Sequence, residues 1–142
     1  MLQIVYTSTA SHEFSAADIE RLLAGARARN KAIGVTGMLL FDDGTFLQAL
    51  EGEQRAVNEV FASIQSDARH RHIAVLHRGP GYEQRVFGDW PLGFADFGGA
   101  ADLLRGFMSL NERARIEDLD RARAMALLAA CGGEDIIKAV GG

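Results

Sequence analysis

The amino-acid sequence predicts an α+β domain that carries a short helical appendage. The chain has 142 residues, the usual size of one domain, and 48% of them are hydrophobic, which is enough to build a core. Segments with alternating apolar residues are interleaved with segments in which apolar residues recur every three or four positions. We therefore expect the order strand, helix, strand, strand, helix, strand, followed by a fifth strand and C-terminal helices.

Residues 2–8 have the pattern of a half-buried strand. Leu2, Ile4 and Tyr6 fall on one face, because successive side chains of a strand point to opposite sides. The phenol of Tyr6 is thus expected to face the core together with aliphatic side chains.

A helix is predicted next. Ser15 can cap its first turn with Asp18 three residues on, as in a capping box, and Gly34 can end it. Its apolar positions are Ile19, Leu22, Leu23 and Ala26. At 100° per residue Asn30 lies about 20° from Ile19, so an amide falls on the apolar face.

The segment GVTGMLLFDDGTFLQALEG predicts two strands joined at residues 42–44. Its Asp-Gly pair supplies the positive φ angles that tight hairpins need. In the second of these strands Phe46, Gln48 and Leu50 share a face.

The later elements follow from the same two periodicities. Val57, Val60, Phe61 and Ile64 recur at helical spacing after Gly52. We then expect a fourth strand over 72–78, a turn at 79–81, a short fifth strand around Trp90 within 86–97, helices over 100–110 and 117–131, and an amphipathic tail over 134–142.

This order is that of the ferredoxin-like βαββαβ unit, with an added strand. In that topology the first and third strands are neighbours, which we expect to run parallel, and both helices cover one face of the sheet. Residues 1–97 would form this unit, and residues 98–142 a helical cap on the opposite face, or an output segment. If these helices leave part of that apolar face exposed, a homodimer would be favoured because it would cover the rest.

Tyr6, Gln48 and Asn30 would then converge beneath the two helices. A buried amide or phenol without a partner costs about 1–3 kcal/mol, so these groups need hydrogen-bonding partners. Two arrangements meet that need: the three side chains bond one another, or they bind a planar polar ligand.

Composition restricts the class of function. The net charge of -4 gives no general attraction to nucleic acid, and no apolar run approaches the roughly 18 residues of a membrane span. Cys131 is the only cysteine, and no Cys and His cluster has metal-ligand spacing. We expect a cytoplasmic protein without a metal site, in which local groups such as Arg27, Arg29 and Lys31 could hold a small anion.

Several stretches match one known family in order and spacing: IVYTS, ARARN, GVTGMLLF, GTFLQALEG, AVNEVFASI, DARH and RVFGDWPLGF. Through residues 1–97 the chain resembles the BLUF family of flavin-binding blue-light sensors. The resemblance implies that the ring of an FAD, or of FMN or riboflavin in its place, lies between the two helices. The 45 residues after residue 97 are too few for a cyclase or phosphodiesterase domain, so the chain resembles the short, stand-alone members of the family. We therefore expect a sensor with no enzymatic activity that signals to a partner protein, which the sequence does not identify.

The resemblance also assigns roles to single residues. Tyr6 would donate an electron and a proton to the excited flavin, Gln48 would bridge Tyr6 and the flavin, and Asn30 would bind the carbonyl and imide edge of the ring. Further contacts with the flavin are expected from Leu22, Arg29, Phe46, Ile64, Arg69 and His70.

Two of these further positions carry alternatives. Arg29 could stack on the ring, meet a phosphate, or be a solvated surface residue. In DARH we favour Arg69 and His70 for contact, and expect a structural role for Asp67 at the helix end.

The signalling positions depart from the family pattern. Trp90 matches the family tryptophan, but Leu92 replaces the usual methionine and Pro91 precedes it. Leucine lacks the polarisable, weakly accepting sulfur of methionine. We therefore expect flavin binding to be kept and the lifetime or output of the signal to differ.

Two other functions fit the predicted fold. One is a phosphate-handling hydrolase similar to acylphosphatases, with Arg29 or Arg69 binding the anion and Asn30 orienting water. Against it, TSTASHEF after the first strand holds neither Gly nor Arg. The other is a flavin-free protein-interaction module, whose pocket side chains would fill.

Overall fold

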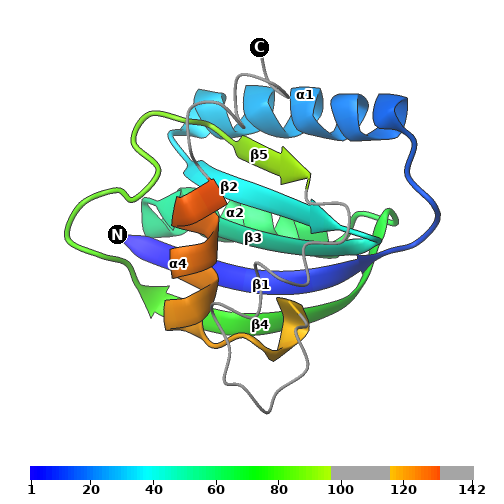
Figure 1. The fold of residues 1–142 in the computed structure, drawn as a ribbon. Helices are drawn as coiled ribbons and strands as arrows, with labels where there is room; N and C mark the ends of the chain where they lie inside the picture. Colours follow the sequence, from blue (N-terminus) through cyan, green and yellow to red (C-terminus); the bar gives the residue numbers. More distant parts are fainter. Residues whose placement is uncertain (97–115, 132–142) are drawn as a thin grey trace.

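The computed structural model describes residues 1–96 and 116–131 (Figure 1). The helix expected over 100–110 and the tail expected over 134–142 lie outside the described residues. The elements, in order, are β1 Leu2–Ala10, α1 Ala16–Ile33, β2 Thr36–Asp42, β3 Thr45–Gly52, α2 Gln54–Gln65, β4 His70–Pro80, β5 Gly93–Asp96, a 3-10 turn Ile116–Asp118 and α4 Arg121–Cys131. The predicted ferredoxin-like order with an added strand is confirmed.

The five strands form one sheet in the order β4-β1-β3-β2-β5. The first and third strands are neighbours, as expected, but the expectation that they run parallel is wrong: β1 pairs antiparallel with β3. The helical crossover makes β2 parallel to β1, and the tight hairpin then reverses the chain, so β3 must run against β1.

The local signals act as expected. The backbone amide of Asp18 donates to Ser15 Oγ over 3.1 Å, and the amide of Ser15 donates to Asp18 Oδ2 over 2.9 Å, which completes the capping box. Gly34 ends α1 with φ 76°. Asp43 and Gly44, with φ of 46° and 83°, form the hairpin turn between β2 and β3.

The fifth strand is shorter and later than expected. It begins at Gly93, where it pairs in parallel with Met38 of β2. Trp90, Pro91 and Leu92 therefore lie in the segment that leads into the strand rather than in the strand itself. Their main-chain oxygens are held by Gly37 N, Asn30 Nδ2 and Arg27 Nε, at 3.2, 2.8 and 2.9 Å.

The sheet has a helix layer on each side, and Figure 1 shows α4 in front of the sheet with α2 behind it. On one face α1 and α2 pack through two clusters that include Ile4, Tyr6 and Phe46. On the other face α4 packs on Val5, Leu47 and neighbouring apolar residues. The expected cover of the second face is thus confirmed for α4.

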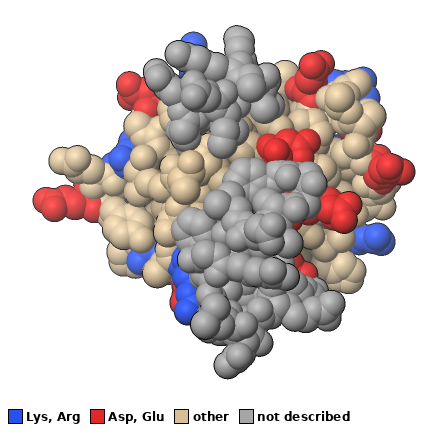
Figure 2. Space-filling view, viewed as in Figure 1, with Lys and Arg blue, Asp and Glu red and all other residues tan. Residues whose placement is uncertain are grey.

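Acidic and basic side chains are interspersed on the visible described surface of the α4 side (Figure 2). No helix among the described residues has both the length and the apolar character needed to cross a bilayer.

Candidate functional site

A cavity of about 240 Å³ lies on the face of the sheet that α1 and α2 cover. α1 lines one side of it, the end of α2 and the start of β4 line the other, and β2 and β3 supply residues from the sheet. Its lining residues are Leu22, Gly25, Ala26, Arg29, Leu39, Gln48, Ile64, Asp67, Arg69, His70 and Leu92.

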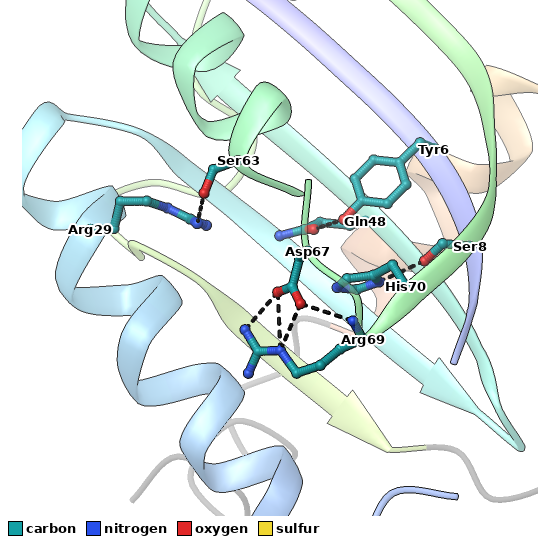
Figure 3. A network of polar contacts seen from close by, with 8 residues as sticks. All are labelled: Tyr6, Ser8, Arg29, Gln48, Ser63, Asp67, Arg69 and His70. Carbon is teal, nitrogen blue, oxygen red and sulfur yellow. Dashed lines mark hydrogen bonds and ion pairs between the residues drawn. The ribbon is translucent and has the colours of Figure 1, made fainter. Parts of the chain in front are cut away.

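Tyr6 and Gln48 form a buried hydrogen bond at the floor of this cavity. They are direct partners across β1 and β3, and the Tyr6 hydroxyl donates to Gln48 Oε1. The Gln48 amide nitrogen lies on the side away from Tyr6 (Figure 3). Burial raises the pKa of Tyr6 well above its ordinary value of 10.0, so the phenol keeps its proton.

Arg29 bridges the two helices above the cavity (Figure 3). Its Nη1 donates to Ser63 Oγ of α2 over 3.2 Å, while its Nε is buried without a hydrogen-bond partner. Burial lowers the pKa of Arg29.

Asn30 is fully buried at the end of α1. Its Nδ2 donates to the main-chain oxygen of Pro91, and its Oδ1 has no partner. Asn30 lines a second cavity, of about 290 Å³, together with Thr36, Arg85 and Pro91. Of the three polar side chains expected to converge, two bond each other and the third binds the main chain beside Leu92.

A charged pair and a histidine form the wall near the start of β4. Asp67 accepts from Arg69 Nη2 over 2.6 Å and from Arg69 Nε over 3.0 Å, and these side-chain bonds lower the pKa of Asp67. His70 Nδ1 lies 2.9 Å from Ser8 Oγ, and burial lowers the pKa of His70. At pH 7 the wall therefore carries a neutral imidazole beside a paired carboxylate.

The structure brings most of the predicted site residues to one cavity. Leu22, Arg29, Gln48, Ile64, Arg69, His70 and Leu92 line it directly. Tyr6 lies one hydrogen bond behind Gln48. Phe46 is further back, with its ring centroid 4.8 Å from that of His70. Trp90 packs instead on the cluster of the α4 face.

Four lining residues were not assigned to the site from the sequence. Gly25 and Ala26 stand three and four positions after Leu22, so helical spacing could have found them. Leu39 is the direct cross-strand partner of Gln48, a relation that needs the strand register. Asp67, expected to be structural, both lines the cavity and anchors Arg69.

The arrangement suits a flat ligand with a polar edge. The walls are apolar at Leu22, Ile64 and Leu92, while Arg29, which also lines the cavity, has a buried Nε without a partner. Asn30 Oδ1 also lacks a partner, but Asn30 lines the second cavity. Buried polar atoms without a hydrogen-bond partner are rare and destabilise the fold unless a further group bonds to them. The volume lies just below the roughly 300–1,000 Å³ of ligand sites, so it suits a ring system better than a whole dinucleotide.

The described residues offer no alternative centred on a metal, since residues 1–96 and 116–131 contain no group of three or more His, Cys, Asp or Glu placed to bind one.

Comparisons with known proteins agree on one family. The model described as "BLUF: Sensors of blue-light using FAD" matches residues 1–93. A curated relative, the photoactivated adenylate cyclase subunit alpha of Euglena gracilis, is 34% identical over 88 residues, which are 62% of this chain and 8% of that protein. The chain thus spans less than a tenth of the length of this relative.

Two solved structures match over nearly their whole length. BlsA in its photo-activated state has a TM-score of 0.78 and 26% identity, covering 90% of this chain and 94% of BlsA. The dark-state structure of the BLUF protein BlrB has a TM-score of 0.72 and 29% identity, covering 91% of this chain and 95% of BlrB.

Proposed function

The chain belongs to the BLUF family of blue-light sensors that use FAD, and from this premise we propose that its 240 Å³ cavity holds the ring of a flavin between α1 and α2. BLUF domains are flavin photoreceptors and are not themselves catalytic. We also propose which flavin is bound, which residues hold it and by which route the signal leaves.

The hydrogen bond from Tyr6 to Gln48 is the observation that carries the proposal. A bound flavin supplies the absorption of blue light and, once excited, an acceptor for an electron. Tyr6 holds the proton that can move, on a hydroxyl aimed at Gln48 Oε1. Because an amide has an acceptor at one end and donors at the other, rotation of the Gln48 side chain exchanges what it offers to the cavity.

The chain's own residues bind and orient the ring. Leu22 and Ile64 supply apolar contact from the two helices, and Arg29 Nε, on the wall of the cavity, is free to bond a polar atom of the ligand. We propose the same role for Asn30 Oδ1, which also lacks a partner. Arg69 and His70, on the wall beside β4, are placed to contact the chain attached to the ring, and Phe46 supports His70 from behind. We propose FAD as the native flavin, with FMN or riboflavin able to replace it.

The signal is proposed to leave through the sheet toward α4 and a separate partner protein. Trp90 belongs to the cluster that α4 covers, whereas Leu92, two residues on, lines the cavity, so this short segment contacts both faces. We also propose a homo-oligomer, in which a second copy of the chain would pack on the face that α4 covers. A cytoplasmic location accords with a single cysteine, which is buried on α4.

The two other candidate functions have less support. An anion-binding hydrolase would need a free arginine in the cavity, but Arg69 is bound to Asp67, whose carboxylate also lines the cavity and would repel an anion. An interaction module with a filled pocket does not account for a cavity that is lined by Arg29 with its unpartnered Nε.

Absorption spectroscopy of the purified protein tests the function. We expect a yellow protein whose flavin bands shift slightly to the red under blue light and return in darkness. Heating the protein releases the bound flavin, and chromatography then identifies it as FAD, FMN or riboflavin. A colourless protein that takes up no added flavin, or a flavin complex that blue light leaves unchanged, would contradict the proposal.

A further inference from the structure

Glu51 is a buried carboxylate to which neither the family assignment nor the cavity gives a role. It is only 1% exposed, near the end of β3. It stands three positions after Gln48, so its side chain points to the opposite face of the sheet. A buried charge is costly unless hydrogen bonds compensate it, so the groups around it indicate what it holds.

Three donors converge on this carboxylate. The amides of Val86 and Phe87 donate to Glu51 Oε2 and Oε1 over 2.9 and 2.8 Å. The hydroxyl of Thr36, its cross-strand partner on β2, donates to Oε1 over 3.1 Å. Arg85 completes the group by donating to Thr36 Oγ1 over 2.8 Å. Two of the three bonds to the carboxylate therefore come from main-chain amides of a segment that lies outside the sheet.

The segment that Glu51 holds has no regular secondary structure between β4 and β5. Its position depends on bonds to other elements, since it has no ladder of its own. The amide of Trp90 donates to the main-chain oxygen of Phe87 over 3.2 Å, which joins the part bonded to Glu51 to the part that enters the cavity. Leu92, two residues later, lines the cavity together with Gln48.

We propose that Glu51 is a positioning residue for the photoreaction: its carboxylate fixes residues 86 and 87 to β3. Together with the bonds from Gly37, Asn30 and Arg27 to residues 90–92, it sets the place of Leu92 in the cavity that Gln48 also lines. β3 then carries Gln48 on one face and, on the other face, Glu51, which holds the segment that brings Leu92 into the same cavity. This inference rests on the proposed function of Gln48, and its test is built so that the two can fail separately.

The replacement Glu51→Gln tests the bonds between this carboxylate and the segment, because glutamine has nearly the same shape as glutamate. A glutamine nitrogen cannot accept from a main-chain amide, so one bond to the segment is lost. Losing one bond to a charged acceptor corresponds to about a tenfold larger population of the displaced segment. Trp90 is the only tryptophan of the chain, so 5-fluorotryptophan gives one fluorine NMR signal that reports on this segment.

Two results are expected from Glu51→Gln. The fluorine signal of Trp90 broadens or splits in darkness, and dark recovery of the red-shifted state becomes several-fold faster, because Leu92 restrains Gln48 less. Flavin affinity stays within about twofold of the wild type, since Glu51 lies on the face away from the cavity. Glu53→Gln, which removes an exposed carboxylate two residues away, is the matched control and should change neither signal.

Both results are required. A variant that folds but keeps a single wild-type fluorine signal, or keeps the wild-type recovery rate, overturns the inference. If Glu51→Gln does not fold, Thr36→Val removes one donor to the same carboxylate and is judged by the same criteria. If the wild-type protein shows no red shift, the proposed function fails, and the fluorine spectra still decide whether Glu51 holds the segment.

Discussion

Tyr6 and Gln48 face each other across β1 and β3 and share a buried hydrogen bond from the phenol to the amide oxygen. Antiparallel pairing in this register places the two side chains on the same face of the sheet. The amide lines the cavity, and the phenol lies behind it without exposure to solvent. Tyr6 can therefore act on a bound ligand through Gln48, and solvent does not compete for its proton.

Replacing Tyr6 by phenylalanine should keep flavin binding and abolish the red shift. The ring still fills the space beside Phe61, but the hydroxyl proton is gone. Absorption difference spectra under blue light measure this. The other tyrosine, Tyr82, is 44% exposed, so Tyr82→Phe is the control and should respond like the wild type. A normal shift in Tyr6→Phe would refute Tyr6 as the donor.

Replacing Leu92 by methionine should change the dark recovery time and leave the size of the red shift as it is. Leu92 is buried and lines the cavity with Gln48, and the sulfur of methionine offers a weak acceptor that leucine lacks. We expect a change of several-fold, on the order of a weak contact of about 1 kcal/mol. Leu127→Met, made on the buried face of α4 and away from the cavity, is the control. Unchanged kinetics would remove position 92 from the signalling route.

Replacing Gly37 by alanine should destabilise the fold. A Cβ at Gly37 would overlap the main-chain oxygen of Ala49 on β3, which cannot move aside without breaking the sheet. We expect a loss of at least about 1–3 kcal/mol in the free energy of unfolding, measured by urea titration without flavin.

Gly25→Ala is the matched control for Gly37→Ala. A Cβ at Gly25, inside α1, would meet no heavy atom within 4 Å. This replacement should stabilise the flavin-free protein by about 0.5–1 kcal/mol. Equal stability of the two variants would contradict the close approach of β2 and β3 at Gly37.

The stability of the flavin-free protein should fall as the pH drops below about 6.5, the ordinary pKa of histidine. Burial lowers the pKa of His70 in the folded state, and the carboxylate of Asp67 opposes this only in part. The unfolded chain therefore binds more protons between the folded and unfolded pKa values, so the free energy of unfolding rises with pH across that window. The slope from this residue is at most about 1.4 kcal/mol per pH unit, the limit for one proton.

Urea titrations between pH 5 and pH 7.5 measure this slope in the wild type and in His70→Gln. The variant should be less sensitive to pH, because glutamine does not titrate there. Asp67 does not mask the effect, since its lowered pKa confines its own contribution to pH values below its ordinary 3.8. A His70→Gln variant with the full wild-type slope would show that another group is responsible.

Local sequence patterns are enough to predict which side chains face the core. Alternation placed Tyr6 and Gln48 among apolar neighbours, and the capping box and the Asp-Gly turn marked where α1 begins and where the hairpin reverses. These signals are local: each depends on a few consecutive residues whose spacing reflects strand or helix geometry. The family resemblance then predicted a role for this pair in flavin photochemistry.

How distant segments meet is visible in the three-dimensional fold and not in the sequence patterns. The antiparallel pairing of β1 and β3, the bond from Asn30 to the main chain of Pro91 and the three donors to Glu51 were not visible in any periodicity. The segment 85–92 is irregular, and its contacts link side chains to main-chain atoms far along the chain. Such contacts depend on register and on the path of a loop, which residue spacing does not encode.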